Sequence, residues 1–162
     1  MIVKPVIAPP DTAAVAVACT PPAGGAESVD YRSLAEFRYA IRRFLAFSEA
    51  AASEAGLTAQ QHQALLTIKG VGEADGLSIG ELATRLLVRQ HTAAELANRL
   101  EEAGLVRRRP DPNDGRRVLL TLTPESENRL QALSGIHQDE ISSMAPQLVS
   151  ILAKLSGAET QE

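Results

Sequence analysis

The alternation of apolar and polar positions is most regular in residues 77–123, where it predicts two short helices followed by a two-stranded ribbon. Ser78 and Glu81 have the spacing of a capping box, so the first helix is expected to begin there. A turn at residues 86–88 separates it from a second helix over about residues 89–103. The apolar face of the second helix consists of Ala93, Leu96, Ala97 and Leu100. Gly104 should end this helix, because glycine best tolerates a left-handed helix end.

A hairpin is predicted next. Residues 105–109 and 117–122 have the pattern of extended strands, and residues 110–115 between them are rich in Pro, Asp, Asn and Gly. That composition is typical of a loop. The order helix, turn, helix and basic hairpin predicts a winged helix-turn-helix over residues 57–123, in a mostly α fold with a small β-hairpin wing.

Amphipathic helices are expected on both sides of this region. Residues 30–56 should form one long helix, with a stripe at three- and four-residue steps made of Leu34, Phe37, Ile41, Phe44, Leu45 and Ser48. Thr58 and Gln61 form a second capping-box pattern, and Gly70 and Gly72 should end the helix that begins there.

The last predicted helix covers residues 124–157. Thr123 suits its N-cap and Pro124 its first position. Its apolar stripe consists of Leu130, Leu133, Ile136, Ile141 and Met144, and Pro146 is expected to break or restart it. Wide apolar faces at both ends of a chain would be exposed in a monomer. Residues 30–56 and 124–157 are therefore predicted to be the dimerisation helices of a homodimer.

Residues 1–29 are rich in Pro, Ala and Gly and are predicted to form a flexible or loosely docked arm. The arm is either an inert tail or a segment that crosses to the partner subunit. It contains Cys19, the one cysteine, which has no basic neighbour to lower its pKa and cannot form an intrachain disulfide. This favours a reducing, cytoplasmic location. No apolar run approaches the roughly 18 residues needed to span a bilayer, and Pro9 and Pro10 interrupt any export signal.

Composition adds two points. The 162 residues are 44% hydrophobic but only 3% aromatic, which favours closely packed helices over a β-sandwich. The net charge is −4, yet residues 77–117 carry eight arginines against six acidic residues, a net +2. Because the distribution of charge matters more than its total, the predicted winged region remains compatible with a nucleic-acid partner.

At these residues the chain resembles the MarR family of bacterial transcription regulators. The family's wing pattern is present as Asp114-Gly115-Arg116 and an alternating strand that ends at Leu122-Thr123. Its helix-turn-helix is matched by Gly80-Glu81-Leu82-Ala83 and by Arg99-Leu100-Glu101. The resemblance implies a homodimer on a pseudo-palindromic operator, and a repressor whose effector is small and aromatic or phenolic.

Two positions depart from the family pattern. Glu95 stands where a basic residue is frequent, so the family's base preference cannot be transferred to this chain. Ser126 stands where a glycine usually follows the Leu-Thr pair, which concerns the start of the last helix.

Double-stranded DNA is the expected partner. Base-edge contacts are predicted from the start of the second helix, by Arg89, Gln90, His91 and Thr92. Glu95 either accepts from a cytosine amine, or repels phosphate and pairs with Arg99 four residues later. On the wing, the family match assigns Arg116 to the minor groove or its backbone, with Asp114 orienting it. Arg107, Arg108, Arg109 and Arg117 either contact phosphates or only keep the hairpin solvated.

No metal site, cofactor or enzyme is expected. The histidines His62, His91 and His137 lack the spacing of metal ligands. His62 is either a ligand-binding residue, as the position of the family's effector pocket implies, or a partly buried polar residue. Two other functions stay open. One is a winged-helix protein-interaction module without DNA binding, which the acidic net charge motivates, and the other is a thiol-based oxidant sensor that uses Cys19.

Overall fold

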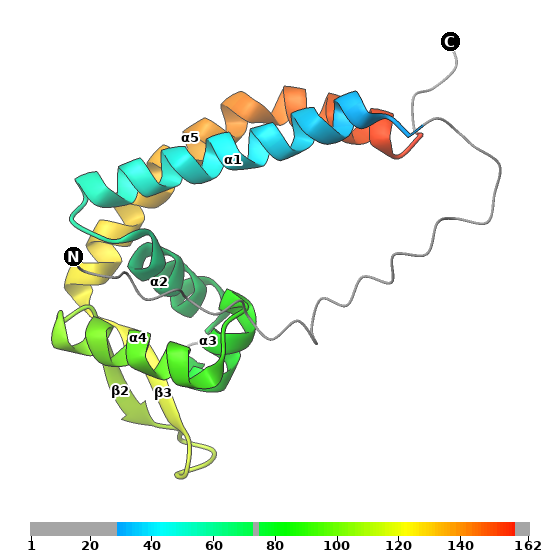
Figure 1. Cartoon of the computed structure of the whole chain (residues 1–162). Coiled ribbons are helices and arrows are strands. Elements are labelled where there is room, and N and C mark those ends of the chain that lie inside the picture. Colours follow the sequence, from blue (N-terminus) through cyan, green and yellow to red (C-terminus); the bar gives the residue numbers. More distant parts are fainter. Residues whose placement is uncertain (1–28, 73–74, 158–162) are drawn as a thin grey trace, which may run out of the picture. The chain divides into compact units, whose positions relative to one another are not determined.

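The computed structural model describes residues 29–72 and 75–157, so the predicted arm, with Cys19, lies outside the described residues except for Val29. The described elements are mostly helical, with one small sheet (Figure 1). The chain divides into two compact units. We call them the winged unit, with described residues 63–72 and 75–126, and the helical unit, with residues 29–62 and 127–157.

The winged unit contains the predicted helix pair. These helices are α3 (Ile79–Leu86) and α4 (Gln90–Glu102). The capping box at the start of α3 is confirmed, since Ser78 accepts from the Glu81 amide and Glu81 accepts from the Ser78 amide. Leu87 adopts a left-handed conformation after α3, with φ 54° and ψ 41°, and Gly104 does so after α4, with φ 69°.

The sheet has three strands, where the sequence predicted two. They are β1 (Leu77–Ser78), β2 (Val106–Pro110) and β3 (Val118–Leu122), in the order β1-β3-β2. The predicted hairpin is the antiparallel pair β2–β3, in which Val106 is opposite Leu122. β1 pairs with β3 through two positions only, a length too short to show an alternating pattern in the sequence.

The core of the winged unit is formed by buried residues of α2, α3, α4 and the sheet. The four predicted apolar residues of α4 are all buried, as are Leu82 of α3 and Leu120 of β3, which have 0% exposure. Burying one leucine side chain contributes roughly 1.5–3 kcal/mol, so this face fixes which side of α4 points away from the protein.

The helical unit contains α1 (Tyr31–Glu54), the first residues of α2 (Ala59–Val71) and most of α5 (Pro124–Leu155). Arg43 of α1 pairs with Glu140 of α5, and Ser48 contacts His137, so the two helices run antiparallel (Figure 1). Asp30 caps α1, and Thr58 with Gln61 forms the predicted capping box of α2.

One predicted helix end is displaced and another is wrong. α2 ends at Val71, directly before Gly72 as expected, but Gly70 lies inside the helix. α5 is continuous through Pro146, which was expected to break it. Pro146 has no backbone N–H, so the carbonyl of Ser142, four residues earlier, lacks its helical hydrogen bond. Ser142 is exposed, so water can bond to this carbonyl instead and the helix can continue.

The predicted stripe of α1 is only partly buried within one chain. Small residues form its buried positions, including Ala40, Ala51 and Ala52, whereas Leu34, Ile41 and Leu45 are 41–56% exposed. On α5 Leu130, Leu133 and Met144 are buried, but Ile136 and Ile141 are exposed. The helical unit therefore retains large apolar side chains that the described residues leave exposed.

Candidate nucleic-acid interface

The outer face of α4 carries the residues predicted to meet base edges. Arg89, Gln90, His91 and Glu95 are exposed and Thr92 is half-buried. Arg89 is the N-cap, and no side chain accepts from the first-turn amides, in contrast to the fully capped α3. Free amides at a helix N-terminus favour an anion there. The predicted arrangement of this face is present, while contact with bases remains a prediction.

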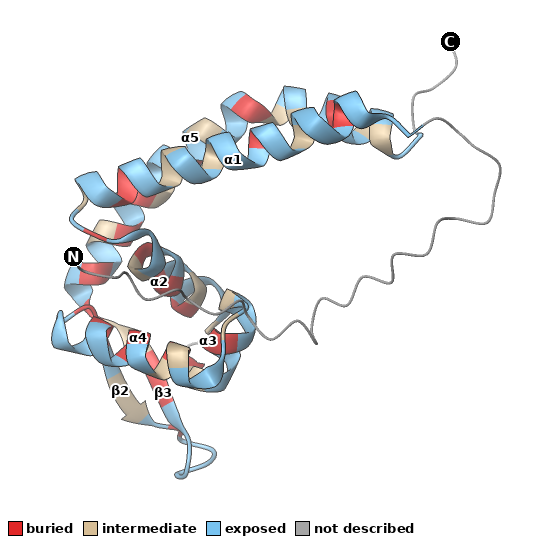
Figure 2. Cartoon of the chain, in the orientation of Figure 1, coloured by how far each residue is buried: buried red, intermediate tan, exposed pale blue. Residues whose placement is uncertain are grey.

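The wing tip is ordered by backbone contacts. Arg117 donates its amide to the Asp114 carbonyl at 2.8 Å, and the Asp111 amide donates to the Arg117 carbonyl at 3.0 Å. The Asp114 carboxylate accepts from the Arg116 backbone amide at 3.0 Å, so Asp114 orders the loop and not the guanidinium that it was expected to orient. Residues 112–118 are exposed (Figure 2), and the Arg116 side chain has no ion pair within the described part of the chain.

The other arginines of the hairpin have different surroundings. Arg108 donates to Glu101 at 2.8 Å and to Asn98 at 2.6 Å, both on α4. Arg109 donates to the Asp75 carboxylate at 2.6 Å.

Arg117 lies 3.4 Å from Glu81 and 3.7 Å from Asp111. Arg107 is exposed, and the described residues offer it no ion pair. Of the four arginines, Arg108, Arg109 and Arg117 therefore form ion pairs within the described structure. The sequence of the strands alone does not predict which arginines are paired.

The comparisons with known proteins agree with this geometry. The model of the MarR family matches residues 55–117, which contain α3, α4, β2 and the wing loop. Within these residues the chain is similar to the MarR family.

The HTH-type transcriptional regulator YcgE of Bacillus subtilis is 33% identical over 97 residues, which are 60% of this chain. The match spans 61% of that relative's length.

Solved structures show the same fold at low identity. A MepR mutant of Staphylococcus aureus, solved bound to an oligodeoxyribonucleotide, has a TM-score of 0.59 and 20% identity, over 78% of this chain and 97% of that one. CouR of Rhodococcus jostii, solved bound to p-coumaroyl-CoA, has a TM-score of 0.62 and 18% identity, over 85% of this chain and 100% of that one. In the described residues of this chain, no helix has the length and apolar character to cross a membrane.

Two acidic residues, Glu81 of α3 and Glu95 of α4, differ in their surroundings. Hydrogen bonds from the Ser78 side chain and amide hold the pKa of Glu81 below its usual value, so Glu81 stays ionised beside Arg117. On α4, Glu95 and Arg99 form no ion pair in the described structure, although their spacing allowed one. Glu95 is thus an exposed carboxylate on the outer face of α4.

His62 lies in the helical unit and is only 5% exposed. Its ring centroid is 4.8 Å from that of His137, a residue that sequence analysis left unassigned. His137 contacts the Leu133 carbonyl at 2.7 Å and the Ser48 hydroxyl at 2.8 Å, and its ring packs edge-on to Phe44 and Phe47. Desolvation, and then the neighbouring His137, lower the pKa of His62. The two rings are packed together, and the lowered pKa favours the neutral form of His62.

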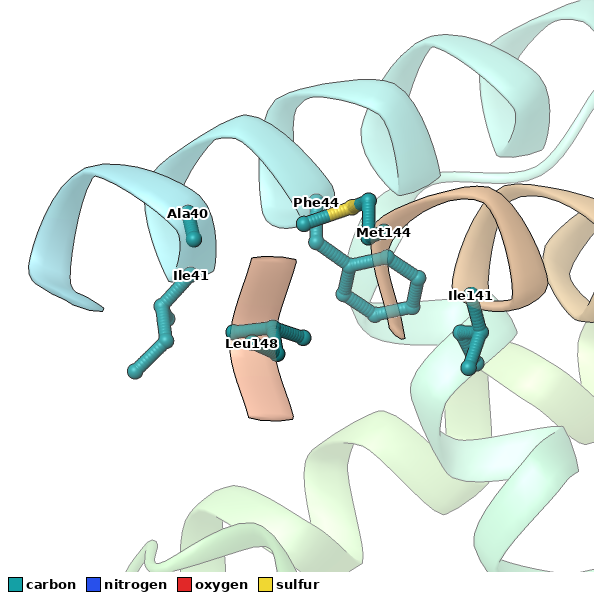
Figure 3. Close-up of a pocket in the computed structure, with 6 residues that line it drawn as sticks. All are labelled: Ala40, Ile41, Phe44, Ile141, Met144 and Leu148. Carbon is teal, nitrogen blue, oxygen red and sulfur yellow. The ribbon is translucent and has the colours of Figure 1, made fainter. Parts of the chain in front are cut away.

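An apolar pocket of about 150 Å³ lies between α1 and α5 in the helical unit (Figure 3). Its walls are Ala40, Ile41, Phe44, Ile141, Met144 and Leu148, all apolar. His62 does not line this pocket. No group of three or more metal-ligating side chains occurs among the residues described.

Proposed function

We propose that this chain is a sequence-specific DNA-binding transcriptional regulator that acts as a homodimer on a pseudo-palindromic operator. The observation that carries the proposal is the combination, within one compact unit, of the exposed polar start of α4 and the exposed Arg116 of the wing. Residues at the start of a helix that enters the major groove meet base edges, and arginine suits the phosphate backbone or a narrow minor groove. The DNA-bound MepR structure, which shares this fold, supports the same use of the surface.

The dimer is supported by apolar surface in the helical unit. Leu34, Ile41 and Leu45 on α1 are exposed, as are Ile136, Ile141, Val149 and Leu152 on α5. Large apolar side chains clustered on a soluble surface usually mark an interface. A twofold dimer would present two α4 helices to half-sites about one duplex turn apart.

Repression relieved by a small aromatic or phenolic ligand is the finer part of the proposal. It is supported by the match to the MarR family model and by CouR, which was solved with p-coumaroyl-CoA. Release of a bound operator duplex by phenolic acids or their CoA thioesters would test it. The buried position of His62 makes direct ligand contact by this residue less favourable than the sequence suggested.

The decisive experiment selects duplexes from a random or genomic pool with the full chain, then measures binding by fluorescence anisotropy at several salt concentrations. Arg116→Ala should weaken binding to every duplex and reduce the salt slope by about one. Gln90→Ala should change which sequence is preferred, by about 1–3 kcal/mol at one base pair. Arg32→Ala, which removes an exposed arginine from the helical unit, is the matched control and should change neither.

Equal, sequence-independent losses from Arg116→Ala and Gln90→Ala would refute this division of roles. Absence of salt-dependent duplex binding by the wild type would refute DNA binding itself. Salt-insensitive capture of a protein partner would then favour the protein-interaction module. Peroxide sensitivity of operator binding that disappears in Cys19→Ser would instead support the oxidant-sensor alternative.

A further inference from the structure

Arg108 connects the wing to α4. Its backbone lies in the middle of β2, where it pairs with the buried Leu120 of β3, so the base of the side chain is fixed by the sheet. Its guanidinium reaches α4, donating through Nη1 to Glu101 Oε2 at 2.8 Å and through Nη2 to Asn98 Oδ1 at 2.6 Å. Asn98 and Glu101 are three residues apart and therefore on one face of the helix. A planar guanidinium can hold two such acceptors at once, and an ammonium cannot reproduce that geometry.

The apolar contacts of α4 fix its buried face, but they do not reach the side that carries Asn98 and Glu101. Two of its four buried residues are alanines, and apolar packing has no directional preference. Hydrogen bonds do have a preferred direction. The two bonds from Arg108 therefore hold a side of α4 that the core contacts do not, in its C-terminal half.

We infer that Arg108 is a positioning residue that fixes α4 relative to the hairpin, so that Gln90 and Arg116 meet one duplex together. The inference rests on the proposed DNA-binding function and assigns Arg108 and Asn98 a role other than contact with DNA. Glu101 compensates the charge of Arg108, and the Asn98 side-chain oxygen is already used. Both nitrogens at the tip of the guanidinium and the Asn98 side-chain oxygen are therefore engaged within the protein.

Arg107 provides the matched control. It precedes Arg108 on β2, and because side chains of a strand alternate between faces, it points to the opposite side. It is exposed and has no ion pair in the described structure. Arg107→Gln and Arg108→Gln remove the same charge from adjacent positions, so any difference between them reports the contacts with α4.

The test measures Kd against salt for the selected operator and for an unrelated duplex. Arg108→Gln should weaken operator binding about tenfold, the loss expected when charge-assisted hydrogen bonds that hold a structure are removed. It should leave the salt slope and the binding of unrelated duplex unchanged. Arg107→Gln should weaken both duplexes and lower the slope by about one if it meets a phosphate.

Arg108→Lys keeps the charge but not the two-pronged geometry, so it should behave like Arg108→Gln. Full recovery by lysine, or a lower salt slope in Arg108→Gln, would overturn the inference in favour of a phosphate contact. Glu101→Gln alters only one of the two bonds and guards against misfolding of the arginine variant. Its effect should be non-additive with that of Arg108→Gln, and simple additivity would also overturn the inference.

Failure of the proposed function is distinguishable. If the wild type prefers no duplex, the proposed DNA-binding function is refuted. The contact of Arg108 with α4 is then tested by amide hydrogen exchange in α4. Exchange should be faster in Arg108→Gln than in Arg107→Gln. Equal exchange in the two variants would overturn the positioning role.

Discussion

Replacing His62 with glutamine should make the protein's stability less sensitive to acid. His62 is 5% exposed and packs against the His137 ring, and burial followed by this neighbour lowers its pKa in the folded chain below the ordinary 6.5. In the unfolded chain the imidazole takes up a proton near pH 6.5. Above pH 6.5 His62 is neutral in both the folded and the unfolded chain, so the folded state has its full stability there. The contribution of His62 to this stability is lost as pH falls below 6.5 toward the lowered pKa, because the unfolded state then binds more protons.

The size of the effect is bounded without knowing the lowered pKa. One proton taken up only by the unfolded state changes the free energy of unfolding by at most about 1.4 kcal/mol per pH unit. At pH 5.5 the wild type should therefore lose up to about 1.4 kcal/mol through His62. In a chain of 162 residues this corresponds to roughly 3 °C in Tm.

Urea unfolding at fixed protein concentration, from pH 5.5 to 7.5, measures this change. The difference in unfolding free energy between the wild type and His62→Gln should shrink by about 1 kcal/mol as the pH falls through that range. Gln63→Ala, at an exposed position of α2 that carries no titratable group, is the control and should leave the pH dependence unaltered. A difference between the wild type and His62→Gln that stays constant across the range would show that burial of His62 does not exclude the proton.

Two further predictions concern stability and assembly. Ser126→Ala should lower the free energy of unfolding by about 1–2 kcal/mol, because it removes the fully buried hydroxyl that donates to the Leu105 carbonyl at 2.5 Å. Urea unfolding should show a lower midpoint with an unchanged slope. An unchanged midpoint would contradict this prediction. Ile41→Glu should convert a dimer to a monomer in sedimentation, since it places a charge on the exposed apolar face of α1, whereas Glu49→Gln, an exposed α1 residue, should not. A dimer that survives Ile41→Glu would move the interface elsewhere.

Local signals in the sequence were enough to predict the winged unit. Ser78 and Glu81 predicted the start of α3, and the apolar positions of α4 predicted its buried face, because both depend on neighbours within one or two turns. Partners distant in the chain were not predictable. The pairing of Arg109 with Asp75, 34 residues away, and the packing of His62 on His137 exist only once the elements meet.

The departure at position 126 also needed the structure for its explanation. Ser126 was expected to affect only the start of the last helix. It does so through Thr123, whose hydroxyl accepts from the Ser126 amide at 3.3 Å. The same serine also donates to the carbonyl of Leu105, 21 residues earlier, and so connects the start of α5 to the chain just before β2.

The turn between α3 and α4 has a conformational cost. Leu87 is the one non-glycine with positive φ in the described residues, and its side chain is 62% exposed. A left-handed leucine is disfavoured by roughly 1–2 kcal/mol, and this one gains little from burial. The turn offsets part of this cost with backbone bonds, because the Leu87 amide donates to the Thr84 carbonyl at 3.3 Å and the Val88 amide to the Ala83 carbonyl at 3.0 Å. A peptide cut to these two helices would keep those two bonds but lose the contacts of both helices with the rest of the core.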